Sequence, residues 1–128
     1  MPNSEERRIS NNYVLDSLPQ EEYALLQPNL EEVELQQGEV LHEVRERITE
    51  VYFPTAGLLS WVNSTPQGEE VEMGVTGNEG MAGIPLFLKE EGSPWKVQVQ
   101  IKGRALKLRA DSFTEVLKQA PVLQQKVA

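Results

Sequence analysis

Short segments in which apolar and polar residues alternate constrain the fold of this chain more than any other feature. They occupy residues 31–36, 69–75 and 96–101. Because successive side chains of a β-strand point to opposite faces, each segment predicts a strand with one face in contact with solvent. Further short strands are expected at residues 39–44, 50–53, 57–64 and 104–110. Turns are expected where glycine or proline separates them, at residues 37–38, 54–57, 66–68, 77–78 and 103.

Many short strands at near-regular spacing indicate a sheet that closes on itself or forms two layers, since an open sheet would leave unpaired edges. We therefore predict a mainly β protein with flanking helices, folded as a double-stranded antiparallel β-roll of the jelly-roll type. The length of 128 residues suits one domain of this kind.

Apolar residues recur at helical spacing near both ends of the chain. Pro19 and the two glutamates that follow it fit the first turns of a helix that ends at Pro28. Farther along, Asp111 is the expected N-cap of a helix whose apolar face includes Phe113, and Pro121 is expected to open a second helix. This last helix has no capping glycine, so we expect the chain to be a piece of a longer protein.

The composition argues against several functional classes. The chain has 20 acidic and 12 basic residues, a net charge of −8, and most of its surface would repel the phosphates of nucleic acid. It has no cysteine, which removes disulfides, iron–sulfur clusters and thiolate metal sites. No apolar run approaches the roughly 20 residues that span a bilayer, and no signal peptide is evident. We predict a cytoplasmic protein with no membrane partner.

Metal binding and catalysis are also disfavoured. His42 is the single histidine, so a histidine-rich metal site cannot be assembled and a haem site has no second histidine. The serines Ser60, Ser64, Ser93 and Ser112 have no histidine base at a recognisable spacing. We predict no metal, no resident cofactor, no catalytic residues and no enzymatic activity.

The segment at residues 77–100 places four glycines beside an apolar run and suggests a loop that could cradle a phosphate. Backbone N–H groups in such a loop can bind anions, and an aromatic ring can stack on a base. A plain turn at residues 78–80 and a packing role for the tryptophan are the alternatives that the sequence leaves open. The candidate ligand-binding residues are Gly77, Asn78, Glu79, Gly80, Gly83, Ser93, Trp95 and Lys96.

Several motifs in a fixed order give the chain a resemblance to a known family. They are LPQEEYALLQPNLEEVELQQGEVL at residues 18–41, VYFPTAG at residues 51–57 and GEEVEMGVTGNEGMAGIPLFL at residues 68–88. Together they resemble the N-terminal, cyclic-nucleotide-binding-like sensor domain of Crp/Fnr transcription regulators. The resemblance covers residues 16–128, which we expect to be the β-roll domain with a truncated C-terminal helix. Residues 1–15 are expected to be a flexible N-terminal segment because no apolar pattern marks a buried face.

The resemblance also indicates how a ligand would be held. In ligand-binding members, backbone N–H groups and an arginine bind the cyclic phosphate, and a glutamate after a glycine accepts a hydrogen bond from the ribose. Here the residue after Gly83 is Ile84, and the arginine position falls on Ser93 or Trp95. Nearby lysines lack the bidentate geometry of a guanidinium. A cyclic nucleotide is therefore a disfavoured ligand.

The resemblance implies a regulatory, effector-sensing domain of a bacterial transcription regulator. Its partner would be an unidentified small-molecule effector or a protein. It would reach DNA only through a helix-turn-helix domain outside this chain, and the full-length protein would be a homodimer. The alternative is a stand-alone β-roll binding or scaffold module that acts through a protein partner. A small cupin-like enzyme is a third class, and it would require a bound metal.

Overall fold

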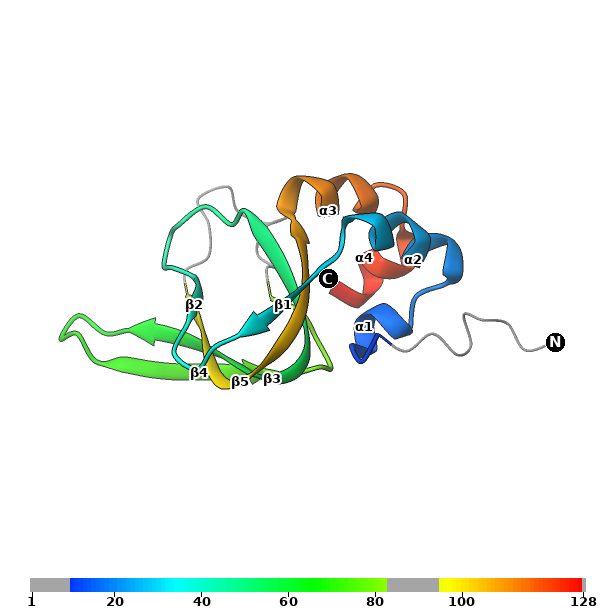
Figure 1. Cartoon of the computed structure of the whole chain (residues 1–128). Coiled ribbons are helices and arrows are strands. Elements are labelled where there is room, and N and C mark those ends of the chain that lie inside the picture. The colour runs from blue at the N-terminus through cyan, green and yellow to red at the C-terminus, as the bar shows by residue number, and fades with distance from the viewer. Residues whose placement is uncertain (1–9, 83–94, 128) are drawn as a thin grey trace.

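The computed structural model of the chain describes residues 10–82 and 95–127. Its helical segments are α1 (Tyr13–Asp16), α2 (Gln20–Leu26), the short 3-10 helix η2 (Gln27–Asn29), α3 (Ala110–Leu117) and α4 (Pro121–Val127). Its strands are β1 (Glu31–Leu35), β2 (Val40–His42), β3 (Glu50–Ser64), β4 (Glu70–Thr76) and β5 (Lys96–Arg109). Figure 1 shows the helices gathered at one end of the curled sheet, with the β3–β4 hairpin extending away from them.

Within the described residues, all of the strand pairs are antiparallel and belong to one sheet. The order along the sheet is β1-β5-β3-β4, and β2 pairs with the first part of β5. The long strand β5 therefore pairs with β1, β2 and β3, which curls the sheet into a roll (Figure 1). The predicted mainly β fold, an antiparallel β-roll with flanking helices, is confirmed.

Strands β3 and β5 are each continuous where the sequence predicted two shorter strands. The turns expected at residues 54–57 and at Gly103 are wrong, because both strands continue through these positions with local register shifts. Gly57 has a φ of +92°, and a Cβ atom there would lie 2.5 Å from the Ile101 carbonyl oxygen. A Cβ atom on Gly103 would overlap the Ala56 carbonyl group. The two glycines let the strand backbones approach closely where they bend.

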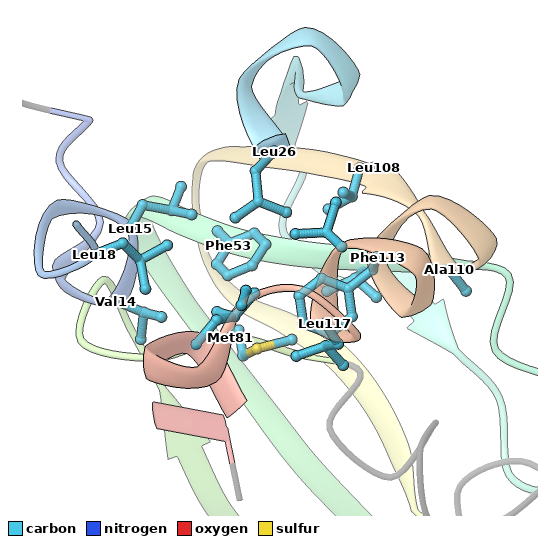
Figure 2. Close-up of a cluster of buried hydrophobic side chains, with 14 residues drawn as sticks. Val14, Leu15, Leu18, Leu26, Phe53, Met81, Leu108, Ala110, Phe113 and Leu117 are labelled. Carbon is cyan, nitrogen blue, oxygen red and sulfur yellow. The ribbon is translucent and has the colours of Figure 1, made fainter. Parts of the chain in front are cut away.

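Buried side chains form two clusters on opposite faces of β3. The helical cluster lies between the sheet and the helices and includes Phe53 and Phe113, whose ring centroids are 6.0 Å apart. Figure 2 shows side chains from α1, α2 and α3 converging around Phe53. Tyr52, the neighbour of Phe53, faces the other way because strand side chains alternate. The roll cluster on that face consists of Leu35, Tyr52, Leu59, Ala82, Val97, Val99 and Ala105.

The helices begin near the residues that the sequence indicated. Helix α4 begins at Pro121, as predicted. Pro19, which was expected in the first turn of α2, is instead its N-cap, because α2 begins at Gln20. The predicted N-cap of α3 is wrong, because α3 begins at Ala110 and Asp111 lies in its first turn. Phe113 is fully buried, as its place on the apolar face of α3 indicated.

The first described residues pack against the rest of the domain. Asn12 is the N-cap of α1, and its side-chain Oδ1 accepts a hydrogen bond from the Leu15 N–H at 3.2 Å. Asn12 and Leu15 are both fully buried, and Val14 is nearly so. The segment that the sequence indicated to be flexible, residues 1–15, therefore overlaps a helix whose side chains complete the helical cluster.

The apolar residues of β4 are exposed, whereas the alternating pattern had indicated a buried face. Met73 is the extra residue of a β-bulge in the pairing with β3, because Gly74 lies opposite Trp61 and Glu72 lies opposite the next residue of β3. The bulge changes the face to which the following residues point, so one alternating stripe cannot continue along the strand. The exposed fractions are 47% for Val71, 55% for Met73 and 46% for Val75.

Candidate functional site

The candidate ligand-binding residues are divided between two described segments and a part of the chain that the structure does not describe. Gly77, Asn78, Glu79 and Gly80 form a turn after β4, which we call the 77–80 turn. Trp95 and Lys96 lie at the start of β5. Gly83 and Ser93 lie outside the described residues, as does Ile84.

The 77–80 turn carries its own negative charge. The Gly77 N–H donates to both carboxylate oxygens of Glu79, at 3.1 and 3.2 Å. The Gly80 N–H donates to the Gly77 carbonyl at 3.3 Å and closes the turn. A backbone donor that could attract a phosphate is therefore already bonded to a carboxylate, whose charge repels an approaching anion.

Asn12 and Tyr13 attach this turn to the helical end of the molecule. The side-chain amide of Asn12 donates to the Gly80 carbonyl at 2.8 Å and to the Pro54 carbonyl at 2.7 Å. The Tyr13 N–H donates to the Asn78 carbonyl at 2.7 Å. Sequence reasoning missed Asn12, although an asparagine is among the preferred N-caps and could have marked the start of a helix.

Trp95 packs against a second tryptophan that the sequence analysis did not select. The ring centroids of Trp61 and Trp95 are 6.0 Å apart with an interplanar angle of 79°, which is an edge-on arrangement. The indole N–H of Trp61 donates to the Thr76 hydroxyl at 2.7 Å. Because Thr76 directly precedes the 77–80 turn, Trp61 connects Trp95 with that turn.

Lys96 lies on the opposite face of the sheet from this tryptophan pair. It is opposite Val62 in the register of β3 and β5, and Val62 and Trp61 point to different faces as neighbours in a strand. The Lys96 ammonium forms an ion pair with the Glu70 carboxylate. Lys96 is therefore already paired with an acid and does not reach the 77–80 turn.

A groove of about 400 Å³ follows the face of the sheet on which Glu70 lies. Polar side chains of β3, β4 and β5 line much of it. The Ser60 hydroxyl donates to the Glu72 carboxylate at 3.0 Å and lies 3.1 Å from the side-chain oxygen of Gln100. The Glu72 carboxylate gives the groove a negative charge that an anionic ligand would have to overcome, whereas the Glu70 carboxylate is paired with Lys96.

A second polar cluster lies where β2 meets β3 and β5. The imidazole Nε2 of His42 lies 3.0 Å from the Glu50 carbonyl oxygen, and its ring meets Tyr52 edge-on. The Glu50 carboxylate accepts a hydrogen bond from the Tyr52 hydroxyl at 3.1 Å and pairs with Lys107 at 2.9 Å. Nδ1 of His42 is buried and has no hydrogen-bond partner in the described part of the chain.

Burial and charge act differently on these four groups. Burial lowers the pKa of His42 and raises the pKa of Tyr52. The hydrogen bond from Lys107 lowers the pKa of Glu50, and the same contact raises the pKa of Lys107. The cluster therefore favours a neutral imidazole beside a stable ion pair.

Neither a metal centre nor a membrane span is found in the segments that the structure describes. Over residues 10–82 and 95–127, no three histidine, aspartate or glutamate side chains gather closely enough to hold a metal ion. Over the same residues, no helix is both long and apolar enough to cross a bilayer.

Comparison with protein families matches residues 32–120 to the family described as the cyclic nucleotide-binding domain. A comparison with curated proteins finds no match. The matched residues include β1 without its first residue, β2 to β5, the 77–80 turn and α3.

Solved structures of regulators have a similar fold. The N-terminal domain of a transcriptional regulator from Streptomyces coelicolor A3(2) is 19% identical, with a TM-score of 0.71, over 94% of this chain and 85% of that one. The sensor domain of the transcriptional regulator DNR from Pseudomonas aeruginosa is 14% identical, with a TM-score of 0.75, over 95% and 82%. The catabolite activator protein of Thermus thermophilus is 15% identical, with a TM-score of 0.74, over 91% and 55%. At these identities the likeness concerns the fold.

Proposed function

The chain belongs to the cyclic nucleotide-binding domain family, and from this premise we propose that it is the effector-sensing domain of a Crp/Fnr-type bacterial transcription regulator. We propose in addition that it does not bind cyclic AMP in the manner usual for such domains. Its effector is then a different small molecule or a partner protein. The descriptions of the similar structures as a regulator domain, a sensor domain and a catabolite activator protein support the regulatory role.

The observation that carries the second part of the proposal is the occupied 77–80 turn. The Gly77 N–H is bonded to the Glu79 carboxylate, so a phosphate at this turn would have to displace a charged group of the protein itself. Lys96 gives no compensation, because it pairs with Glu70 on the other face. Trp95, one of the two residues at the expected arginine position, contacts Trp61 and brings no positive charge. A less negatively charged effector suits these surroundings better.

Helix α4 is the element through which a bound effector would act on the rest of a regulator. Glu22 on α2 holds its N-terminus, because the carboxylate accepts from the Val122 N–H at 3.0 Å and from the Leu123 N–H at 2.9 Å. An effector that prefers one arrangement of roll and helices shifts the population toward that arrangement, and only by its difference in affinity. The direction of α4 would then set the position of the DNA-binding part.

The net charge of −8 is consistent with a chain that senses an effector while a separate part of the protein binds DNA. DNA affinity depends on cations that neutralise phosphates, so a chain with this charge is not the part that holds DNA. In the proposal a helix-turn-helix domain outside this chain supplies those cations, in a cytoplasmic homodimer.

A stand-alone module that binds a partner protein is the second candidate function. The observation that favours it is the exposure of Val71, Met73 and Val75 on the extending hairpin, since exposed apolar side chains that gather on one element often mark a contact surface.

The experiment that separates the two candidates uses the product of the whole gene. Its binding to the DNA upstream of its own gene is measured by electrophoretic mobility shift, with residues 1–128 alone as the matched control. The regulator proposal predicts a shift with the whole product and none with residues 1–128. A whole product that lacks a basic domain, or that causes no shift, would favour the stand-alone module.

A further inference from the structure

Asn12 is a fully buried polar residue whose side-chain amide makes three hydrogen bonds. Both protons of its side-chain amide are donated, one to the Pro54 carbonyl of β3 and one to the Gly80 carbonyl of the 77–80 turn. Its Oδ1 accepts from the Leu15 N–H, which caps α1. An aspartate of the same shape could not make the two donations. The residue therefore joins a strand, a turn and a helix at one point.

The backbone of Tyr13 makes a second connection to the same turn. Its N–H donates to the Asn78 carbonyl at 2.7 Å, although its side chain is 67% exposed. Asn12 and the Tyr13 N–H thus hold the turn from both sides, at Gly80 and at Asn78. We refer to these two groups as the N-terminal latch.

The latch leads directly into the helical cluster. Val14 and Leu15 of α1 and Leu123 of α4 belong to that cluster, which Figure 2 shows around Phe53. Close-packed interiors do not absorb a displacement locally, so a movement of α1 requires the neighbouring side chains to repack.

The start of α4 is itself fixed by the same layer of helices. Pro121 has no N–H, Val122 and Leu123 donate to the Glu22 carboxylate, and the Gln124 N–H donates to the Ala120 carbonyl at 3.0 Å. Every donor of the first turn of α4 therefore has a partner. A repacking of the helical cluster would alter contacts on which these bonds depend.

We propose that the N-terminal latch couples the 77–80 turn to helix α4. Asn12 is then a positioning residue, and a change in the conformation of the turn is transmitted through it to the start of α4. This coupling extends the proposed sensing function, and its regulatory role rests on that function. It gives residues 10–16 a part in regulation.

The substitution Tyr13→Pro tests the latch with little disturbance elsewhere. It removes the N–H that bonds to Asn78 together with an exposed side chain, at the first position of a helix, where proline is favoured. Asn12 already has a φ of −121° and a ψ of 125°, which is the conformation that a residue before proline adopts. Tyr13→Ala is the matched control, because it removes the same exposed side chain and keeps the N–H.

The measurement is amide hydrogen exchange of the ligand-free domain. We expect Tyr13→Pro to raise the exchange rate at Gly80 by about tenfold, because the loss of one hydrogen bond makes opening of the turn easier. The exchange rates at Val122 and Leu123 should rise as well. Exchange at Val97 and Val99, which belong to the roll cluster, should change no more than the global stability does. Tyr13→Ala should leave all of these rates near those of the unchanged protein.

A second variant removes the other half of the latch. Asn12→Asp replaces a donor with an acceptor, and we expect the same pattern at Gly80, Val122 and Leu123. Asn29→Asp makes the same chemical change at an exposed amide and serves as its control. A rise confined to the turn in both latch variants, or a uniform rise over the domain, would overturn the coupling to α4. Because no ligand is used, this result is independent of whether the domain binds a nucleotide.

Discussion

The substitution Glu22→Ala should destabilise the whole domain although it removes only one polar side chain. Glu22 is 4% exposed, and its carboxylate accepts from two backbone N–H groups at the start of α4. A buried donor left without a partner costs about 1–3 kcal/mol, so two such donors would cost about 2–6 kcal/mol. The lower half of this range is expected, because Val122 is only partly buried and water can reach its N–H.

The assay is equilibrium unfolding in urea, followed by the fluorescence of Trp61 and Trp95. The expected loss for Glu22→Ala is about 2–4 kcal/mol in the free energy of unfolding. Glu22→Gln should lose about half as much, because an amide can accept only through its oxygen. Glu21→Ala, one residue away and exposed, is the matched control and should change stability by less than about 0.5 kcal/mol. Equal effects of Glu21→Ala and Glu22→Ala would refute the capping role.

Three further predictions concern the sheet and its core. Gly103→Ala should lower the melting temperature and reduce the free energy of unfolding by about 1–3 kcal/mol or more. Gly74→Ala is the control, because its Cβ atom would meet open space, and it should change neither. Equal melting curves of the two variants by circular dichroism would contradict the close approach at Gly103. Phe113→Ala should cost about 3–5 kcal/mol in urea unfolding, and a loss under about 1 kcal/mol would mean that its contact with Phe53 is not a core contact. Burial lowers the pKa of His42 below its usual 6.5, so the unfolded chain binds a proton before the folded one does as the pH falls. The stability that depends on a neutral His42 should therefore be full above about pH 6.5 and decrease below it. His42→Gln should flatten this pH dependence in urea unfolding.

The sequence predicted the class of fold because an apolar residue at every second position suits a half-buried strand and does not form one face of a helix. The sequence was misleading where the same residue type can have either of two structural roles. Glycine can mark a turn or permit two backbones to approach, and only the three-dimensional pairing shows that Gly57 and Gly103 do the second. The bulge at Met73 could not be predicted for the same reason. An extra residue in one strand is recognised only from its pairing with the partner strand, and the alternation of apolar and polar residues does not show that pairing.

The candidate site was predicted in part. The 77–80 turn follows from its glycines, but the bond from Gly77 to the Glu79 carboxylate depends on backbone geometry that the sequence does not fix. Asn12 and Trp61 were missed because their partners lie 68 and 15 residues away along the chain, at Gly80 and Thr76. Such contacts are set by how the roll closes, and no local pattern encodes them.

The most direct test of the central claim is isothermal titration of this domain with cyclic AMP, with thermal shift as a second readout and cyclic GMP as the comparison. We expect no heat of binding and no change in melting temperature at millimolar nucleotide, because the turn already carries the Glu79 carboxylate and Lys96 is paired with Glu70 on the other face of the sheet. A dissociation constant near micromolar for cyclic AMP would contradict this expectation, and would mean that the domain holds the cyclic phosphate despite the Glu79 carboxylate.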